Sequence, residues 1–406
     1  MNRSYTTVLA GAILAGLLST DASARQVVAD DGRAEARLDF GWLALDPRLS
    51  IRDVGVDTNV FNTANATRTD FTATVGEELG SWVRAGRLYV SSTTRAGWIY
   101  FQKSAEQRSL DFSQVGRADL ALVRLTPHVG GAYERTRQRP NDEIDARVLQ
   151  LRTRANGGVA MHPGTRLTFD LTYEVRTFDF GTGDRFGDVR FAHELNRREG
   201  EATLVTNWAM TPLTTFVVKG ARREDDFESA DERNSRSFSV MSGLEFKPLA
   251  LVSGTALVGF RSFSPVRDDL PGFNGLTAAV DLHYIARDRL RLVTTVNRDV
   301  DYSFEPNLPY YVTTGVRTEA TQALGGSWDV VGRIGLTYMA YQAFDQPGIE
   351  TAGRRDRSLL VGTGIGRRLG QDLRIGVDVN YVTRGSSVPF REYSGVRAGG
   401  SVTYGQ

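Results

Sequence analysis

The sequence predicts an all-β fold, a transmembrane antiparallel up-and-down β-barrel of about 18 strands with short periplasmic turns and longer extracellular loops. Three observations lead to this prediction. Polar and apolar residues alternate along most of the chain, the alternating runs are longer than typical soluble strands, and short connections alternate with long ones. After the N-terminus, no unbroken apolar stretch approaches the ~18 residues that a membrane-spanning helix needs, so a helical membrane protein is excluded.

Composition narrows the class of protein further. The 406 residues include 49 Lys and Arg and 48 Asp and Glu, and the resulting net charge of +1 argues against a nucleic-acid partner. Cys is absent, which excludes disulfides, thiol nucleophiles and Cys-based metal sites. Because the sequence also contains only 4 His and none of the common catalytic motifs, we predict no enzyme activity, no metal and no cofactor.

The N-terminus has the pattern of an export signal. Arg3 precedes an apolar run, Val8–Leu18, that is too short to cross a bilayer, and the small residues Ala22 and Ala24 fit a cleavage site. We therefore expect the chain to be exported. The predicted domains are a signal peptide at 1–24, a periplasmic N-terminal segment or plug at 25–46, and an outer-membrane barrel at 47–406.

Alternation with a period of two places one set of residues on each face of a strand. It is clearest in Leu149–Met161, Arg166–Arg176 and Leu373–Tyr381. Several runs exceed the ~9–11 residues that a tilted strand needs to cross a bilayer, so we expect the apolar set to face lipid and the polar set to face the lumen. The alternative is a soluble two-sheet protein, which would have to bury one face of these very long strands in its core.

The connections divide the chain into about 18 strands, from Leu49–Phe61 to Tyr393–Tyr404. The first of the expected short turns lies near Gly80–Trp82. An even strand number with both ends on the short-turn side is typical of bacterial outer-membrane barrels. Alternation is weakest in Leu88–Phe101 and Leu110–Leu125, so counts from about 16 to about 20 remain open.

Charged residues of both signs are expected to line the lumen, which in a barrel of this size holds water unless a plug fills it. A lumen lined by one sign would indicate selectivity for the opposite sign, and this mixture does not. The favoured interpretation is that these charges pair across neighbouring strands and stiffen the wall. The expected lumen-facing residues are Arg152, Arg154, Asp170, Glu174, Glu245, Asp281, Arg291, Arg317, Glu319, Arg374 and Asp378.

Other polar groups fall in the predicted loops. Pro140–Glu143 and the pair His193 and Glu194 are interpreted as solvated loop residues rather than as sites. Arg forms bidentate contacts with phosphate, so loop arginines are candidates for contacts with lipopolysaccharide. We therefore expect outer-membrane lipids and lipopolysaccharide as partners. The candidate residues are Arg354, Arg355 and Arg357.

The stretch Leu49–Glu77 carries a family resemblance. A first strand that ends in Asp57–Phe61 is followed by a short loop, and Thr69–Phe71 opens the second strand. These segments resemble the putative β-barrel porin 2 family of outer-membrane proteins, some of which are associated with exopolysaccharide or capsule export. The resemblance implies a barrel in the bacterial outer membrane and, more loosely, export components as partners. We expect Tyr404 to serve as the signal for the barrel-assembly machinery.

These observations predict a passive, porin-like pore or conduit in the outer membrane, linked by the resemblance to exopolysaccharide export. The alternative is a closed structural or adhesion barrel that acts through its extracellular loops, mainly Asp179–Arg197 and Asp225–Ser235. An interfacial hydrolase is the third hypothesis. The sequence shows no convincing Ser, His and acid constellation, which argues against it.

Overall fold

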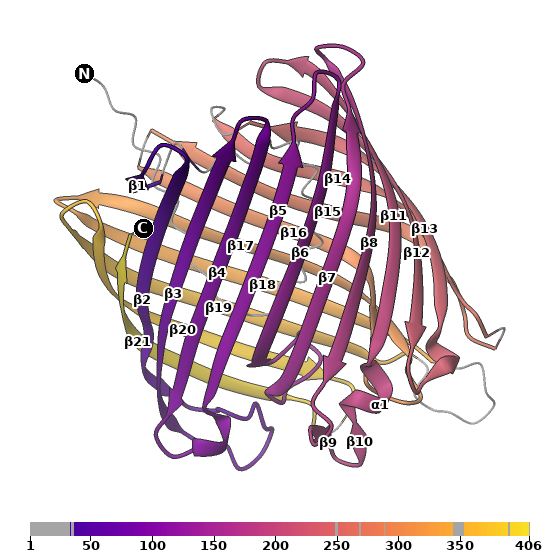
Figure 1. The fold of residues 1–406 in the computed structure, drawn as a ribbon. Helices are drawn as coiled ribbons and strands as arrows, with labels where there is room; N and C mark the ends of the chain where they lie inside the picture. Colours follow the sequence, from indigo (N-terminus) through magenta and orange to yellow (C-terminus); the bar gives the residue numbers. More distant parts are fainter. Residues whose placement is uncertain are drawn as a thin grey trace.

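Long strands pair as consecutive antiparallel hairpins along the chain, as the period-two pattern predicts. The computed structural model describes residues 33, 36–247, 251–267, 269–287, 289–343, 353–388 and 390–405. The last strand, β21 (Tyr393–Tyr404), pairs with the first long strand, β2 (Leu43–Asp57), so the sheet closes on itself (Figure 1). The predicted all-β antiparallel barrel of 18 strands is therefore confirmed.

The barrel strands are 12 to 16 residues long, enough to cross a bilayer when tilted. Between β2 and β21 they are β3 (Asp70–Ala85), β4 (Leu88–Phe101), β5 (Ser109–Leu120), β6 (Leu125–Gln138), β7 (Val148–Met161), β8 (Leu167–Phe180), β11 (Arg197–Thr211), β12 (Thr214–Phe227), β13 (Ser235–Phe246), β14 (Val252–Pro265), β15 (Phe273–Ala286), β16 (Leu290–Tyr302), β17 (Tyr310–Gly325), β18 (Trp328–Gln342), β19 (Arg355–Leu369) and β20 (Leu373–Ser386).

The remaining elements are short and lie outside the barrel wall. None of the helices in the described residues is long and apolar enough to span a membrane. The short elements are β1 (Leu38–Asp39), β9 (Arg185–Phe186), β10 (Val189–Arg190), α1 (Phe191–Leu195) and two 3-10 helices, Ala105–Gln107 and Asp231–Arg233.

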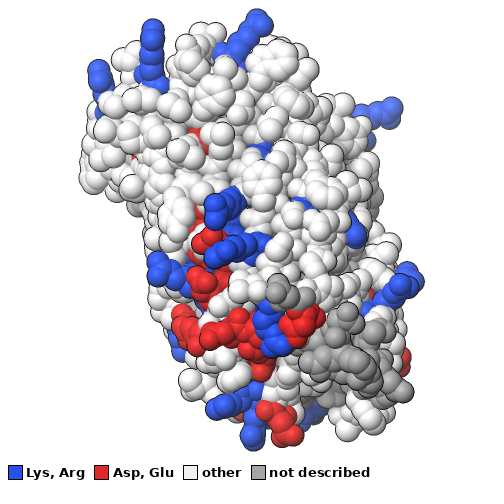
Figure 2. Space-filling model, turned by 90° about the vertical axis from the view of Figure 1, so that its right-hand side faces the viewer, with Lys and Arg blue, Asp and Glu red and all other residues white. Residues whose placement is uncertain are grey.

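Most strands present an apolar face to the outside of the barrel. Along β8, Leu171 and Tyr173 are exposed on the outer face, whereas Asp170 and Thr172 alternate with them on the lumen face. Figure 2 shows a broad, mostly uncharged area on one side of the barrel, with charged side chains gathered toward its lower, loop-bearing end. An apolar outer band flanked by polar ends is the surface that a lipid bilayer requires.

Short turns join the strands at one end of the barrel, and longer loops join them at the other (Figure 1). We take the loop end as extracellular because outer-membrane barrels have short periplasmic turns. The turn predicted at Gly80–Trp82 is wrong, because both residues lie inside β3 and the chain reverses at Gly86, whose φ is +61°. The indole of Trp82 lies over Gly80, which leaves room for the ring because it has no side chain.

Two boundaries near the N-terminus differ from the sequence-based expectation. The first long strand spans Leu43–Asp57 instead of Leu49–Phe61, so the expected barrel start at residue 47 falls inside β2. Proline is uncommon inside strands, so Pro47 did not indicate this extension. Pairing of β2 with β21 begins only at Leu49, and Pro47 therefore lies where this edge of β2 is free and the missing N–H is tolerated. The predicted signal peptide and residues 25–32, 34 and 35 of the N-terminal segment lie outside the described residues.

The seam between β2 and β21 contains a β-bulge. The register of β2 shifts between Ile51 and Val54, and Asp53 has a φ of 53°. Immediately after this bulge, Gly55 packs so closely on the backbone of β21 that a Cβ atom would overlap the carbonyl oxygen of Ala398. Closure of the barrel therefore depends on a glycine at this position.

We expect Gly55→Ala to destabilise the barrel by about 1–3 kcal/mol, because overpacked backbone must shift to accommodate the methyl group. Urea unfolding in detergent micelles, followed by heat-modifiable migration in electrophoresis, measures this change. Gly220→Ala in β12 is the matched control, since a Cβ there would meet no atom within 4 Å. An equal loss of stability in the two variants would contradict the role assigned to Gly55.

Candidate functional site

The strand register places all the residues predicted to line the lumen on the inner face of the wall. Their outer neighbours, such as Leu171 beside Asp170, are exposed on the opposite face. Whether these inner residues act on a transported solute remains a prediction. The inner residues are Arg152 and Arg154 on β7, Asp170 and Glu174 on β8, Glu245 on β13, Asp281 on β15, Arg291 on β16, Arg317 and Glu319 on β17, and Arg374 and Asp378 on β20.

Many inner charges form ion pairs across neighbouring strands. Glu199 of β11 is almost fully buried between Arg176 of β8, at 3.5 Å, and Arg223 of β12, at 2.8 Å. Glu174 continues this network toward β7 through Arg154, at 3.9 Å. Because a buried carboxylate is stable only when it is paired and hydrogen-bonded, these contacts fix the positions of four adjacent strands.

A second network lies on the opposite part of the wall, between β17 and β20. Arg333 of β18 donates hydrogen bonds to Glu319, at 2.7 Å, and to Asp378, at 2.6 Å. Arg374 pairs with Asp329. Sequence reasoning missed Arg333 and Asp329 because the lumen face of β18 also carries apolar residues, which reduces the contrast between the two faces of this strand.

The turn-side part of the lumen wall is exposed to solvent at β15. The side chain of Asp281 is 61% exposed although it lies on the inner face of β15, and it pairs with His283 at 3.0 Å. Arg152, by contrast, lies near the loop side, 3.8 Å from Glu134. The lumen therefore has open space beside β15, although other turn-side positions such as His128 and Asp329 are buried. Its loop-side end, called the mouth below, is crowded.

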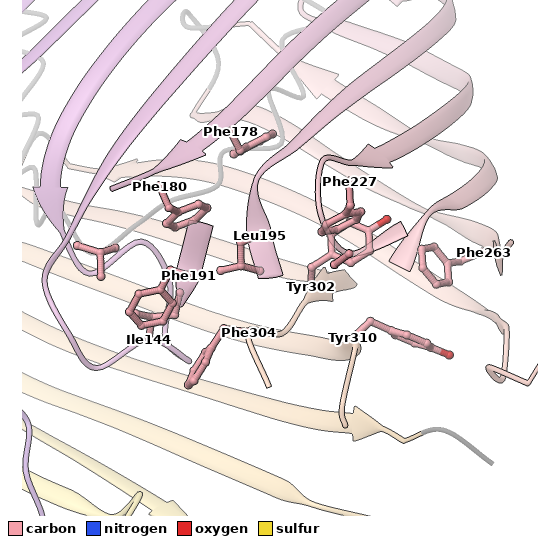
Figure 3. Packing of buried hydrophobic residues seen from close by; sticks show 12 residues of the cluster. Ile144, Phe178, Phe180, Phe191, Leu195, Phe227, Phe263, Tyr302, Phe304 and Tyr310 are labelled. Carbon is pink, nitrogen blue, oxygen red and sulfur yellow. The ribbon is translucent and has the colours of Figure 1, made fainter. Parts of the chain in front are cut away.

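The loop-side ends of β16 and β17 enter the mouth. Tyr302 and Tyr310 pack against Phe227 of β12 and Phe263 of β14, with ring centroids 4.8 Å and 4.9 Å apart (Figure 3). The next residue, Tyr311, points the other way along the strand and is equally buried. Both faces of the hairpin end are thus buried. Beyond Arg298, β16 no longer pairs with β15, whereas β17 stays paired with β18 up to Tyr310.

Two loops from opposite sides of the barrel meet in the mouth. Ser303, after β16, donates a hydrogen bond to Glu143 of the β6–β7 loop at 2.5 Å, and the Phe304 backbone N–H donates to the same carboxylate at 3.3 Å. The Phe304 ring packs edge-on against Phe191 of α1 at 5.2 Å (Figure 3). Glu143 is fully buried, so the prediction that Pro140–Glu143 is a solvated loop tip is wrong.

The β6–β7 loop is also tied to the wall. Arg384 of β20 is fully buried and pairs with Asp145 of that loop at 3.1 Å and with Asp356 of β19. It further donates a hydrogen bond to the Glu143 carbonyl at 2.9 Å. One strand arginine thus binds both a side chain and a backbone carbonyl of the loop.

Arg354, predicted to contact lipopolysaccharide, lies instead inside the mouth. It is buried and pairs with Asp356 at 2.7 Å and with Glu305 at 3.2 Å. The lipopolysaccharide prediction is wrong for this residue, because its charge is neutralised by buried carboxylates. Arg355 and Arg357 are exposed.

Two further loops complete the closure. Arg233 of the β12–β13 loop is buried, pairs with Glu194 of α1 at 2.6 Å and donates to the Ser303 carbonyl. The prediction that Glu194 is solvated is therefore wrong, although His193 beside it keeps a side chain that is 46% exposed. Sequence reasoning had no signal for these contacts, because loops lack the periodicity that identifies strand faces.

Burial changes the acid–base behaviour of the mouth. Desolvation raises the pKa of Glu143 to about 7, and the negative charge of Glu305 adds to this shift. The Ser303 hydroxyl and the positive charges of Arg391 and Arg354 oppose it. Burial also raises the pKa of Asp145, against the pull of Arg384. The contacts that hold the loops together are therefore sensitive to protonation near neutral pH.

A small cavity of about 20 Å³ remains inside the closed mouth. It lies between the β6–β7 loop and the end of β16, beside Asn141, Arg152 and Asp301. A space of this size holds about one water molecule. Loops and hairpin ends therefore leave little space at this point of the mouth.

A family model described as putative beta-barrel porin 2 matches residues 39–405, which is most of the chain. No curated protein matches the sequence. The matched range begins before β2 and extends past the end of β21, so it includes every strand of the barrel.

Several solved structures are similar at low identity. The outer membrane protein opdK from Pseudomonas aeruginosa is 11% identical, with a TM-score of 0.47 over 89% of this chain and 98% of that one. OccAB3 from Acinetobacter baumannii gives the same values. A bacterial polysaccharide outer membrane secretin is 9% identical, with a TM-score of 0.36 over 89% of this chain and 97% of that one.

We expect the closed mouth to weaken as pH rises from about 4.5 to about 7. A solvated Glu143 in an opened loop has the ordinary pKa of 4.5, whereas the buried group has a pKa of about 7, so closing the mouth takes up a proton in this range. Closure is favoured most at or below pH 4.5 and loses up to about 3 kcal/mol by neutral pH. Open probability in planar bilayers should therefore be lower at pH 5 than at pH 8.

Glu143→Gln should remove most of this pH dependence, since the amide does not titrate. Glu106→Gln is the matched control, because Glu106 lies exposed in the β4–β5 loop, outside the mouth. A pH dependence that survives in Glu143→Gln and matches that of the wild type would contradict the assignment to Glu143.

Proposed function

The chain belongs to the putative β-barrel porin 2 family, and on this basis we propose that it is a passive pore for polar solutes across the bacterial outer membrane. The resemblance seen in Leu49–Glu77 is thereby confirmed over most of the chain. The barrel is porin-like, and channel activity is favoured over catalysis. We propose that the structure represents the closed state of this pore.

The observation that carries the proposal is the difference between the two ends of the lumen. Toward the turns, Asp281 of β15 is exposed to solvent inside the barrel. Toward the loops, closure comes from the β6–β7 and β16–β17 hairpins, through polar contacts such as Glu143 with Ser303. Loop segments held by side-chain contacts can separate without breaking the strand ladder that closes the barrel.

A closed structural or adhesion barrel is the second candidate, and the packing of the mouth favours it. Phe191, Phe304 and Tyr302 belong to one buried cluster that resembles a protein core. On this reading the loops form a rigid extracellular surface, and the lumen carries no solute.

Conductance after loop shortening separates the two candidates. We replace residues 304–308 with two glycines, which removes Phe304 and the backbone partner of Glu143 while keeping strands β16 and β17. If the barrel is a pore, the shortened variant should show steady conductance at least several-fold above that of the wild type in planar bilayers. The reason is that the lumen below the mouth is already hydrated.

The matched control is the same replacement at residues 103–107, in a β4–β5 loop of similar length that contacts Asp70 at the rim. Its conductance should stay at the wild-type level. Silence of a folded 304–308 variant would reject the pore and support the closed barrel.

We propose further that the solute is a surface polysaccharide and that the pore assembles with export components in the periplasm. Support comes from the family resemblance stated for Leu49–Glu77, together with a polar, ion-paired wall that offers few strong binding sites to a sliding chain. Deleting the coding sequence should then reduce polysaccharide outside the cell and raise it in the periplasm. Complementation with the wild type should restore both, and unchanged amounts in both compartments would reject this solute.

A further inference from the structure

The outer face of three neighbouring strands, β3, β4 and β5, differs from the apolar outer face of strands such as β14. Near the middle of these strands lie a carboxylate, Glu77, and the polar side chains of Ser92, Thr94 and Gln114. On the outer face of β14, by contrast, Val258 is 60% exposed. The four residues, called the polar seam below, lie at the depth of the lipid tails.

The side chain of Glu77 points away from the lumen. Its neighbours on the same face, Val75 and Leu79, are exposed at 46% and 39%. The adjacent Glu78 points inward and pairs with Arg95 at 2.6 Å. Within the described part of the chain, no hydrogen bond or ion pair reaches the Glu77 carboxylate.

The other members of the polar seam form one hydrogen-bonded group. Thr94 donates to the side-chain oxygen of Gln114 at 2.6 Å, and the Gln114 amide donates to Ser92. Only one of the two amide N–H groups of Gln114 is used in this way. The seam thus presents both an unused acceptor, Glu77, and an unused donor, Gln114.

Lipid is an unfavourable neighbour for this surface. Charged side chains on the lipid face destabilise a barrel most at the bilayer midplane, and polar groups without partners are costly in hydrocarbon. Small residues, Ala96 on β4 and Gly116 on β5, lie beside the polar groups. Between membrane helices, small residues allow two surfaces to approach closely, and the same holds for two sheets.

We propose that the polar seam is covered by the polar seam of a second copy of this chain, in a dimer whose two-fold axis runs along the membrane normal. Two copies in one membrane have the same orientation, so such an axis brings equal depths together. With β4 at the centre, β3 of one copy faces β5 of the other.

This arrangement satisfies the unused groups of the seam. Glu77 lies midway along β3 and Gln114 midway along β5, so the carboxylate of one copy meets the free amide N–H of the other. The contact occurs twice, once on each side of the axis. Self-complementarity of this kind favours a second copy over an unrelated membrane protein.

The available surface is large enough for a specific contact. Five strands, the three of the seam with β2 and β6 on either side, are about 4.8 Å apart. Over an apolar band about 25 Å tall they give a footprint of about 500 Å² per copy. Both copies together bury about 1,000 Å², the size at which specific interfaces begin.

The same feature explains an irregularity in the sequence. Alternation is weakest in Leu88–Phe101 and in Leu110–Leu125, which contain β4 and β5. Near the middle of these strands the outward positions carry polar and small residues, so the contrast between the two faces is reduced in the sequence. Broken alternation is therefore the sequence signature of an outer face that contacts protein instead of lipid.

Thiol cross-linking of the full chain in intact outer membranes tests the dimer. The chain has no Cys, so an introduced thiol is the only one present. Ala96→Cys places a thiol at the centre of β4, beside the axis. Treatment with a short bifunctional thiol reagent should convert most of the variant into a species of twice the monomer mass.

Val258→Cys, on the lipid-exposed outer face of β14, is the matched control and should remain monomeric. A double variant, Glu77→Cys with Gln114→Cys, should also form the dimer, whereas Glu77→Cys alone should not. Heat-modifiable migration identifies variants that have folded. The readout does not depend on whether the barrel conducts ions.

Three outcomes would overturn the proposal. The first is cross-linking of folded Ala96→Cys no greater than that of Val258→Cys. The second is a cross-linked product whose mass contains a different protein, which would give the seam another partner. The third is strong cross-linking of Glu77→Cys alone with none at Ala96→Cys, which would move the axis from β4 to β3.

Discussion

In the hydrocarbon of a membrane, a backbone N–H or C=O group without a partner costs several kcal/mol, and this constraint governs the architecture of the chain. A sheet can satisfy it only by closing, and the pairing of β2 with β21 provides that closure. The bulge at Asp53 and the close approach at Gly55 are local adjustments at the joint. The period-two pattern follows from the same constraint, because a closed wall separates lipid from an aqueous lumen.

Because the period-two pattern follows from closure of the sheet, much of the fold could be predicted from the sequence. A strand face is a local property, so β21 has the predicted bounds Tyr393–Tyr404, and β20 begins at Leu373, where the alternating run begins. Pro47 and Gly80 are residue types common in turns, yet the closed sheet accommodates each of them within a strand, so the sequence does not reveal these two extensions.

The mouth could not be predicted in this way. Glu143 and Ser303 are 160 residues apart, and Arg384 lies 239 residues from Asp145. No periodicity relates such positions, and each reads as an ordinary polar residue of a loop or strand end. Only the closed barrel, which brings opposite hairpins to one opening, creates the buried environment that changes their chemistry.

The ion pairs in the lumen wall have a consequence for how ions would move through an open barrel. Arg333 with Glu319 and Asp378, and Glu199 with Arg176 and Arg223, neutralise each other within a few ångströms. A wall with little uncompensated charge does not enrich counter-ions over the surrounding solution. Current should then rise in proportion to bulk salt, and a salt gradient across the membrane should generate little diffusion potential, as in a neutral aqueous channel.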